Sequence, residues 1–179
     1  MVIEIELRAR IDDKNSFIQK LKTKEGVIYK SSLFQHDEYF KHVTDLDRDL
    51  VLRIRTEDNG KSILTFKAKD TSGGDNAWAD VDAILDDADN LRKIFLTNKY
   101  ELVVDIKKNR ESFEYNGYEI NVDDIKGLGF FVEIEGRGSE EERNNIESNL
   151  KQILSDLGVS ENDFVSKGYV PLMIEKNNA

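Results

Sequence analysis

The chain lacks the residues on which several common kinds of site are built. None of its 179 residues is cysteine, which excludes disulfide bonds, zinc sites with thiolate ligands and cysteine nucleophiles. Its two histidines, His36 and His42, are too few for a metal site made of histidines. We expect both to be structural or surface residues. No apolar run approaches the roughly 20 residues that a membrane-spanning helix needs, so no membrane partner is expected.

A general excess of positive charge is also missing. The formal net charge is −10, which disfavours nucleic-acid binding through a broad basic surface. The first residues read as a strand, without the charged and apolar regions of a signal peptide, so we expect a cytoplasmic protein. The content of 35% charged and 39% hydrophobic residues is that of a soluble globular protein. With no linker or repeat, residues 1–179 are interpreted as a single domain.

The amino-terminal segment alternates strictly between two kinds of residue. One set is Ile3, Ile5, Leu7 and Ala9, and the other is Glu4, Glu6, Arg8 and Arg10. A strand repeats every two residues, so the charged set shares one face. Hard oxygen ligands beside fixed cations suit a divalent metal ion that holds a polyphosphate. A charged face that merely points at water is the alternative for an isolated strand.

Later segments repeat this alternation. We expect extended segments at 27–42, 50–55, 63–69, 78–85, 101–114, 118–123 and 130–135. Asn116-Gly117 predicts a tight hairpin. Helices are expected after an Asp12 or Asp13 cap, from an Asp86 cap to residue 97, after the Ser139/Glu142 capping box, and over 161–175.

Two architectures fit strands that have one apolar and one charged face. In the first, an antiparallel barrel packs its apolar outside against helices and keeps a polar interior for water, ions or ligand. In the second, an ordinary α+β sheet carries helices on one face and exposes its charges to solvent. Periodicity by itself does not separate the two.

The charged faces together supply a candidate site with both signs of charge. Carboxylates would hold Mg²⁺ or Mn²⁺, while arginine and lysine would match the oxygens of a triphosphate. The acids are Glu4, Glu6, Asp123, Glu133 and Glu135, and the bases are Arg8, Arg10, Arg53, Arg55, Lys67, Lys69, Lys108 and Arg110.

The order of these motifs resembles the CYTH superfamily, also called triphosphate tunnel metalloenzymes. The similarity begins at Glu4-x-Glu6-x-Arg8 and covers nearly the whole chain. It continues through Gln35-His36-Asp37-Glu38-Tyr39-Phe40, Leu52-Arg53-Ile54-Arg55, Leu64-Thr65-Phe66-Lys67, Lys108-x-Arg110, Val122-Asp123, Gly127-Leu128-Gly129-Phe130-Phe131-Val132-Glu133-Ile134-Glu135 and Tyr169-Val170-Pro171-Leu172-Met173. The match is most similar to the class IV adenylate cyclase branch.

The resemblance implies a closed eight-stranded antiparallel β-barrel of the α+β class, with a charged interior and helices packed outside. It places the five acids at metal-ligand positions for Mg²⁺ or Mn²⁺. It places Arg53, Arg55, Lys67, Lys108 and Arg110 at phosphate-binding positions. Tyr39 and Lys67 stand where the thiamine triphosphatase branch has a Tyr–Lys pair thought to activate water.

The sequence departs from the family pattern at three places. The stretch between Asp37 and Arg53 is shortened and lacks the usual proline. The third signature residue is usually lysine, whereas Arg8 keeps the charge but cannot act as a base. The middle strand usually reads Arg-x-Glu-x-Glu, whereas here it is Trp78-Ala79-Asp80-Val81-Asp82. The departure removes one predicted phosphate contact and shortens both acids.

The resemblance favours a class IV adenylate cyclase reaction, ATP to cyclic AMP and pyrophosphate. The first alternative is a triphosphatase that hydrolyses tripolyphosphate, thiamine triphosphate or a nucleoside triphosphate. The second is a module that binds a polyphosphate or nucleotide without turnover. In each case the partner is a small-molecule triphosphate. The oligomeric state is open, with a homodimer as one alternative.

Overall fold

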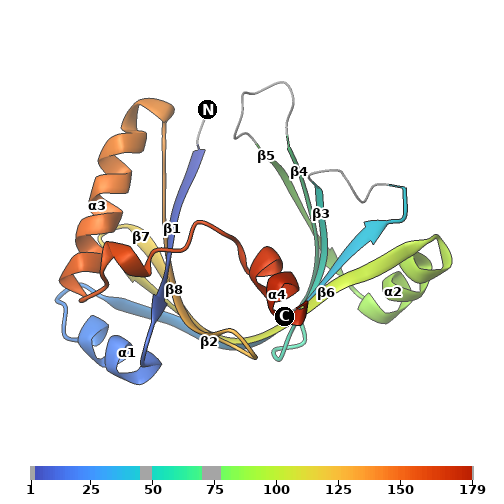
Figure 1. Cartoon of the computed structure of the whole chain (residues 1–179), viewed down its shortest axis with the longest axis horizontal. Helices are drawn as coiled ribbons and strands as arrows, with labels where there is room; N and C mark the ends of the chain where they lie inside the picture. Colours follow the sequence, from blue (N-terminus) through green and yellow to red (C-terminus); the bar gives the residue numbers. More distant parts are fainter. Residues whose placement is uncertain (1–2, 45–49, 70–77, 179) are drawn as a thin grey trace. The chain divides into compact units, whose positions relative to one another are not determined.

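The computed structural model describes residues 3–44, 50–69 and 78–178. Figure 1 traces the chain through eight strands and four α-helices within these ranges. The strands are β1 (Ile3–Ile11), β2 (Ile28–His42), β3 (Leu50–Glu57), β4 (Ser62–Lys69), β5 (Trp78–Leu85), β6 (Tyr100–Tyr115), β7 (Tyr118–Ile125) and β8 (Gly129–Gly138). The helices are α1 (Lys14–Lys22), α2 (Ala88–Thr97), α3 (Arg143–Asp156) and α4 (Tyr169–Asn177).

The strands form one antiparallel sheet in the order β1-β8-β7-β6-β2-β3-β4-β5. The predicted α+β class with an eight-stranded antiparallel sheet is therefore confirmed. The strands at its two ends, β1 and β5, are not joined by a hydrogen-bonded ladder within the described residues. The hairpin predicted at Asn116-Gly117 joins β6 to β7, and both residues have the positive φ that a tight two-residue turn requires.

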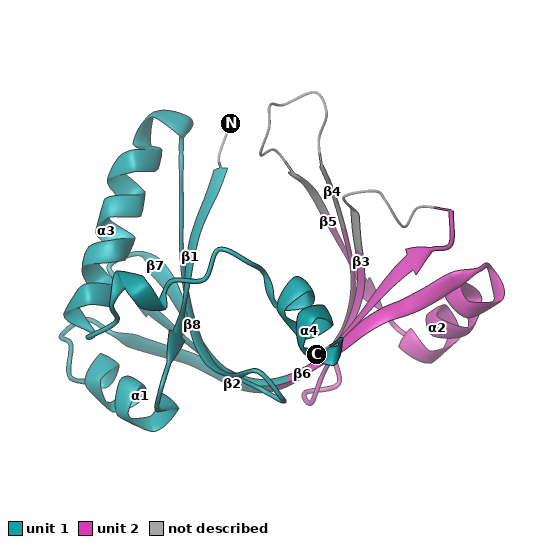
Figure 2. Ribbon diagram, viewed as in Figure 1, with its two compact units in different colours: residues 1–33, 108–179 teal, residues 34–107 magenta. Residues whose placement is uncertain are grey.

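The chain divides into two compact units, coloured separately in Figure 2. Unit 1 comprises residues 1–33 and 108–179, and unit 2 comprises residues 34–107. The long strands β2 and β6 each contribute residues to both units. The single domain expected over residues 1–179 stays a prediction.

In unit 1, helices α1 and α3 cover the apolar face of the sheet (Figure 1). Asp13 caps α1 by accepting a hydrogen bond from the Ser16 N–H. The capping box at Ser139 and Glu142 forms as predicted and precedes α3. The core of unit 1 combines apolar residues from the strands and from the two helices. They include Ile5, Ala9, Phe17, Ile18, Leu21, Phe113, Ile120, Val122, Val132, Ile134, Ile146, Leu150, Ile153 and Leu154.

In unit 2, helix α2 packs against an apolar strand face through Phe95, which contacts Phe40 edge to face. An ion pair from Arg92 to the Glu38 carboxylate ties the helix to β2. The capping residue is Asp87, which accepts a hydrogen bond from Asn90, so the prediction of an Asp86 cap was wrong by one residue. Neighbouring aspartates offer equivalent caps, and the sequence does not distinguish them.

The carboxyl-terminal segment departs from the helix predicted over 161–175. A short 3₁₀ turn at Glu161–Asp163 is followed by extended chain, and α4 begins only at Tyr169. The extended part pairs with β1, because the Val165 N–H donates to the Arg8 carbonyl oxygen at 2.8 Å. Pro171 falls in the first turn of α4, where its missing N–H leaves no helical hydrogen bond unmade.

Among the described residues, no helix combines the length and the apolar character that crossing a membrane requires.

Candidate metal centre

The charged face of unit 1 carries a continuous line of four glutamates. Register places Glu6 opposite Glu135, Glu135 opposite Glu119, and Glu119 opposite Glu114. Like charges that face each other directly across strands destabilise a sheet. We call these four residues the acid row. Such a row calls for compensating positive charge.

Glu4, Glu6 and Glu135 form the metal-competent part of this face. One carboxylate oxygen from each lies within 4.8 Å of the others. Burial, followed by the charges of Glu4 and Glu119, raises the pKa of Glu135 to about 7. Partial withdrawal from water, followed by the charge of Glu133, raises the pKa of Glu6. Mutually repelling hard oxygens at this spacing fit a divalent cation such as Mg²⁺ or Mn²⁺.

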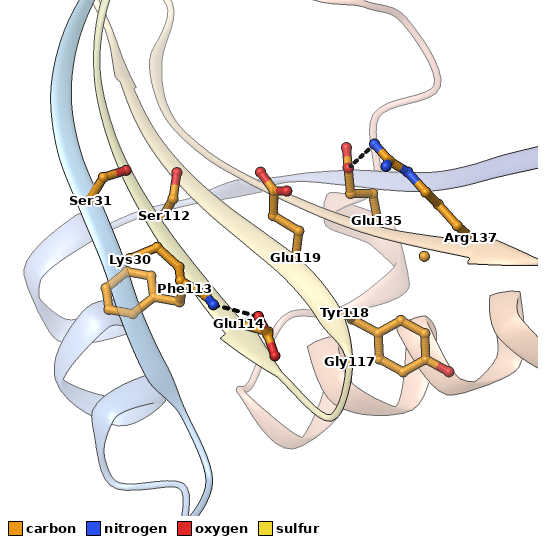
Figure 3. Close-up of a pocket in the computed structure, with 11 residues that line it drawn as sticks. Lys30, Ser31, Ser112, Phe113, Glu114, Gly117, Tyr118, Glu119, Glu135 and Arg137 are labelled. Carbon is orange, nitrogen blue, oxygen red and sulfur yellow. Dashed lines mark ion pairs between the residues drawn. The ribbon is translucent and has the colours of Figure 1, made fainter.

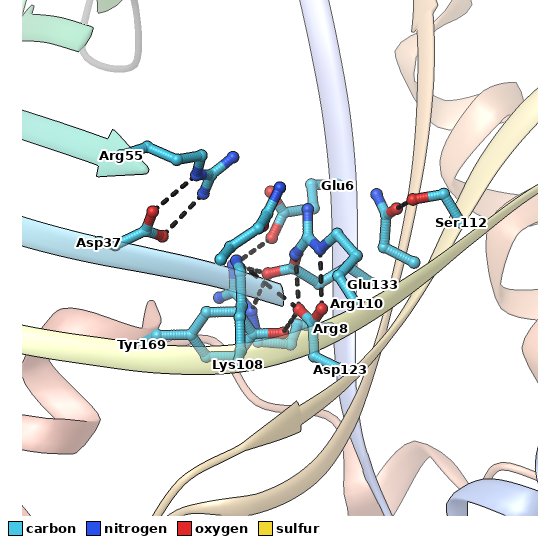
Figure 4. Close-up of polar contacts among 12 residues, drawn as sticks. Glu6, Arg8, Asp37, Arg55, Lys108, Arg110, Ser112, Asp123, Glu133 and Tyr169 are labelled. Carbon is cyan, nitrogen blue, oxygen red and sulfur yellow. Dashed lines mark hydrogen bonds and ion pairs between the residues drawn. The ribbon is translucent and has the colours of Figure 1, made fainter. Parts of the chain in front are cut away.

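Asp123 and Glu133, the other two predicted metal ligands, lie in a buried network with arginines (Figure 4). Asp123 is 0% exposed and accepts from Arg110 Nε at 2.7 Å and Nη2 at 2.5 Å. Glu133 accepts from Arg8 Nε at 2.7 Å and from Arg110 Nη2 at 2.5 Å. Lys108, 3% exposed, places its Nζ 3.9 Å from Asp123 Oδ2.

The electrostatics of this network are opposite to those of the metal-competent acids. Burial by itself would raise the pKa of Asp123, but Arg110 and then Lys108 hold it below its usual value. Glu133 is likewise buried, and Arg110 and then Arg8 hold its pKa low. Both carboxylates therefore carry full negative charge at neutral pH and fix the cations beside them.

The predicted cations of unit 1 differ in how much of their hydrogen-bonding capacity is used. Arg110 binds Asp123 and Glu133 through Nε and Nη2, and its Nη1 has no partner within the described part of the chain. Arg8 also pairs with Glu6 and donates from Nη1 to the Lys167 carbonyl oxygen. Arg10 is exposed, stacks over Phe131 and donates to the Leu128 carbonyl oxygen at 3.2 Å.

Tyr169 is a residue of this network that the sequence did not indicate. Its hydroxyl donates to Asp123 Oδ2 at 3.0 Å, and its ring lies 4.5 Å beneath the Arg8 guanidinium. The ring also lies 5.4 Å from Lys108 Nζ. One side chain from α4 thus touches three charged residues of three different strands. In the sequence Tyr169 is recognisable only as the first residue of the carboxyl-terminal family motif, which does not indicate these contacts.

Unit 2 has its own charged face. Asp37 is 1% exposed and accepts from Arg55 Nε at 2.6 Å and Nη2 at 2.7 Å (Figure 4). Arg53 donates from Nη2 to Thr65 Oγ1 at 2.7 Å, and its buried Nε has no partner within the described residues. An orphaned buried donor is costly unless a ligand satisfies it. A phosphate oxygen is a ligand that an arginine matches well.

Other predicted positions are placed as follows. Burial, followed by Asp37, raises the pKa of Tyr39, so its phenol stays protonated at neutral pH. The side chains of Lys67, Lys69 and Asp80 lie outside the described part of the structure, while Asp82 is exposed.

The two histidines make local contacts. His36 pairs with Asp105, and His42 bonds to Thr44. These contacts agree with the structural role expected for both.

Two further residues were not among the predicted site residues although alternation points to them. Glu119 lies in phase with Asp123 on β7, and Asp37 lies in phase with Tyr39 on β2. The structure shows Asp37 as the partner of Arg55 and Glu119 as a member of the acid row.

Comparisons with known proteins show which proteins this chain is similar to. A protein named "Putative adenylate cyclase" from Methanocaldococcus jannaschii is 32% identical over 96% of this chain and 98% of its own. A conserved hypothetical protein of known structure from Pyrococcus furiosus matches with a TM-score of 0.81 at 25% identity, over 95% of this chain and 99% of its own. A Vibrio parahaemolyticus structure with the same cyclase name has a TM-score of 0.80 at 19% identity over 98% of each chain, which shows the fold.

The CYTH domain model matches residues 2–169. The chain therefore belongs to the CYTH family, as the resemblance in its motifs predicts.

Proposed function

We propose that this CYTH protein carries out divalent-metal-dependent chemistry on a triphosphate, with conversion of ATP to cyclic AMP and pyrophosphate as the preferred reaction. The observation that supports it most is one face of unit 1. There the acid group Glu4, Glu6 and Glu135 adjoins the cations Arg8 and Arg110. The cyclase name belongs to the relatives. The geometry of this face supports the broader part of the proposal, which is metal-dependent chemistry on a triphosphate.

The carboxylates of Glu4, Glu6 and Glu135 would hold Mg²⁺ or Mn²⁺. A bound ion of this kind neutralises and aligns phosphate oxygens for in-line displacement. Glu4 and Glu135 have Arg137 as a neighbour, with the shorter distance 3.3 Å to Glu4 Oε2. That arginine is mostly exposed and can turn away toward solvent. Asp123 and Glu133 stay in the proposal as predicted metal ligands.

The arginines would bind the phosphate chain. Asp123 holds Arg110 through Nε and Nη2, which leaves the two N–H groups of Nη1 as donors. Fixed, dehydrated donors stabilise charge that develops on a leaving pyrophosphate without reorganisation. In a cyclase the ribose 3′-oxygen forms the new bond to the α-phosphorus while the bond to pyrophosphate breaks. Arg53, Arg55, Lys67, Lys69 and Lys108 stay in the proposal as predicted phosphate-binding residues.

Hydrolysis is the second candidate function, and Tyr39 is the observation that bears on it. Its raised pKa suits a phenol that donates a hydrogen bond to phosphate or water, and disfavours a phenolate base. A Tyr39–Lys67 pair would then orient water rather than deprotonate it. A module that binds the triphosphate without turnover is the third candidate.

Product analysis separates these candidates. The purified protein is incubated with Mg²⁺ or Mn²⁺ and with ATP, thiamine triphosphate or tripolyphosphate in parallel. Cyclic AMP with pyrophosphate establishes the cyclase, and orthophosphate establishes a triphosphatase. Binding of a triphosphate without any product establishes the binding module. Failure of every triphosphate to bind in the presence of metal contradicts the proposal.

A further inference from the structure

A cavity of about 530 Å³ adjoins the acid row of unit 1 (Figure 3). Ser31, Ser112, Glu119 and Glu135 line it from four strands, and their side chains rise from the same side of the sheet in the figure. Along β7, Asp123 lies in the arginine network and Glu119 lies in the cavity. The four-residue separation corresponds to about 13 Å. The cavity is therefore a space distinct from the arginine network.

Glu119 is held in a fixed orientation by a buried amide. Asn121 is 2% exposed, accepts a hydrogen bond from Ser112 Oγ at 2.6 Å and donates one to Glu119 Oε1 at 2.8 Å. This chain of hydrogen bonds crosses from β6 to β7 and uses one oxygen of Glu119. The second oxygen, Oε2, has no hydrogen-bond or ion-pair partner within the described residues.

Glu119 differs in this respect from the other acids around the cavity. Glu114 pairs with Lys30 at 2.6 Å, and Glu135 belongs to the metal-competent group and lies 3.6 Å from Arg137. Glu119 lies between these two acids in the register but is not part of the metal-competent group. Glu119 is exposed, so its second carboxylate oxygen is open to a donor or a cation of a ligand.

We propose that this cavity receives the organic part of the triphosphate substrate, and that Glu119 selects an organic group bearing an amino donor or a fixed positive charge. The inference rests on the proposed function and deepens it. Lys30 and Arg137 also line the cavity, but Lys30 pairs with Glu114 and Arg137 lies beside Glu135, so the lining keeps a net negative charge at Glu119. The phosphate chain then extends toward Arg8 and Arg110. The phosphorus nearest the organic group then lies beside Glu6 and Glu135, which is the position that cyclisation needs.

The test is equilibrium binding by calorimetry in the presence of Mn²⁺, with ATP, thiamine triphosphate and tripolyphosphate as probes. Adenine offers an amino group, thiamine offers an amino group and a cationic ring, and tripolyphosphate offers neither. The wild-type protein is expected to bind at least one organic triphosphate more tightly than tripolyphosphate. Glu119→Gln keeps the shape and the acceptor for Asn121 but removes the charge. It should weaken binding of that organic triphosphate roughly tenfold or more, and leave tripolyphosphate within about twofold.

The matched control is Glu147→Gln, at a partly exposed α3 residue whose one ion pair within the described residues is with Lys151, and it should change no affinity. Equal weakening of all three probes, or no change in any, overturns the inference. A lower Mn²⁺ stoichiometry in Glu119→Gln also overturns it, because Glu119 would then be a metal ligand. Failure of all three triphosphates to bind the wild-type protein instead removes the proposed function itself, so the two failures are distinguishable.

Discussion

Two groups of carboxylates share one face of unit 1 and have opposite electrostatic properties. Asp123 and Glu133 are buried against arginines, and their pKa values are lowered. Glu6 and Glu135 lie among other acids, and their pKa values are raised. The first group is satisfied by buried cations. In the second, burial and the neighbouring acids outweigh the contacts with Arg8 and Arg137 and leave an unmet demand for positive charge. Both groups are carboxylates, so their surroundings decide the direction in which each pKa shifts.

The largest expected effect comes from breaking the satisfied group. Asp123→Asn takes from Arg110 one of its two buried carboxylate partners and removes the carboxylate that lies 3.9 Å from Lys108 Nζ. Removing one partner of a buried ion pair costs about 3–5 kcal/mol, so chemical denaturation should show a loss of this size. Asp124→Asn is the matched control, since this neighbour lies on the opposite face of β7 and has no ion pair within the described residues. Equal stability of the two variants would contradict the role assigned to Asp123.

Removing a carboxylate from the unmet group should affect metal binding much more than folding. Glu4→Gln deletes one of the three oxygens that lie within 4.8 Å of each other. We expect Mn²⁺ affinity and activity to fall roughly 100-fold or more, since loss of outer partners alone costs 10–100-fold. The unfolding midpoint should be unchanged, because the one ion pair of Glu4 within the described residues, with Arg137, is exposed. Full activity with every triphosphate would contradict the metal assignment.

A substitution at Tyr169 should have an intermediate effect on stability, because Tyr169 contacts the buried carboxylate Asp123 without being charged itself. Tyr169→Phe removes the hydrogen bond to Asp123 but keeps the ring beneath Arg8. A hydrogen bond to a charged group contributes about 1.5–3 kcal/mol, so stability should fall by an amount in this range. We also expect a reduced kcat, because Asp123 fixes Arg110.

Tyr115→Phe provides the control for that experiment. Tyr115 packs against the apolar core and its hydroxyl makes no hydrogen bond within the described residues. A similar loss in both variants would show that the tyrosine at 169 acts only through packing.

The pH dependence of stability should have opposite signs for the two groups. Glu135 has a folded pKa of about 7, above its unfolded value of about 4.3. Its contribution is therefore complete below about pH 4.3 and lost as the pH rises through 7. Asp123 and Glu133 have lowered pKa values, so their contribution is present above about pH 4 and lost on acidification.

Thermal unfolding of the metal-free protein between pH 5 and pH 8 measures the first of these effects. The wild-type protein should lose stability across this range, and Glu135→Gln should flatten the slope. Added Mn²⁺ should reverse the loss at pH 8 in the wild-type protein only. A wild-type slope that survives in Glu135→Gln would assign the effect to another group.

The smallest effect on stability is expected for an exposed ion pair whose N–O distance is similar to that of the buried Arg110–Asp123 pair. Arg143 Nε lies 2.6 Å from Glu140 Oε1 on the surface, close to the 2.7 Å between Arg110 Nε and Asp123 Oδ1. Glu140→Gln should leave the unfolding midpoint unchanged, because solvent screens exposed ion pairs. A shift comparable to that of Asp123→Asn would show that distance, rather than burial, decides the strength of these pairs.

Strand alternation predicted much of the fold because each apolar set is buried against a helix. Ile5 and Ala9 lie in the core with α1 and α3, as their spacing requires. The final helix was mispredicted because Phe164 and Val165 pair with β1. That pairing joins residues far apart in the sequence, and local periodicity does not contain it.

The candidate site was predictable as a set of residues but not as an arrangement. Alternation and family motifs identified Glu4, Glu6 and Glu135, which the structure brings together. The same reasoning gave Asp123 and Glu133 the same role, while the structure surrounds them with arginines. Which charges meet depends on strand order and register, and these follow from contacts between distant segments.

The sequence by itself therefore determined the family, the antiparallel α+β class and which residues face the charged side, because these depend on side-chain period and motif order. Tertiary structure decided which carboxylates are neutralised, how Tyr169 joins Asp123 to Arg8, and how Asn121 orients Glu119. These properties depend on distances of a few ångströms in a medium of low dielectric constant, where one neighbouring charge changes the protonation and bonding of the next.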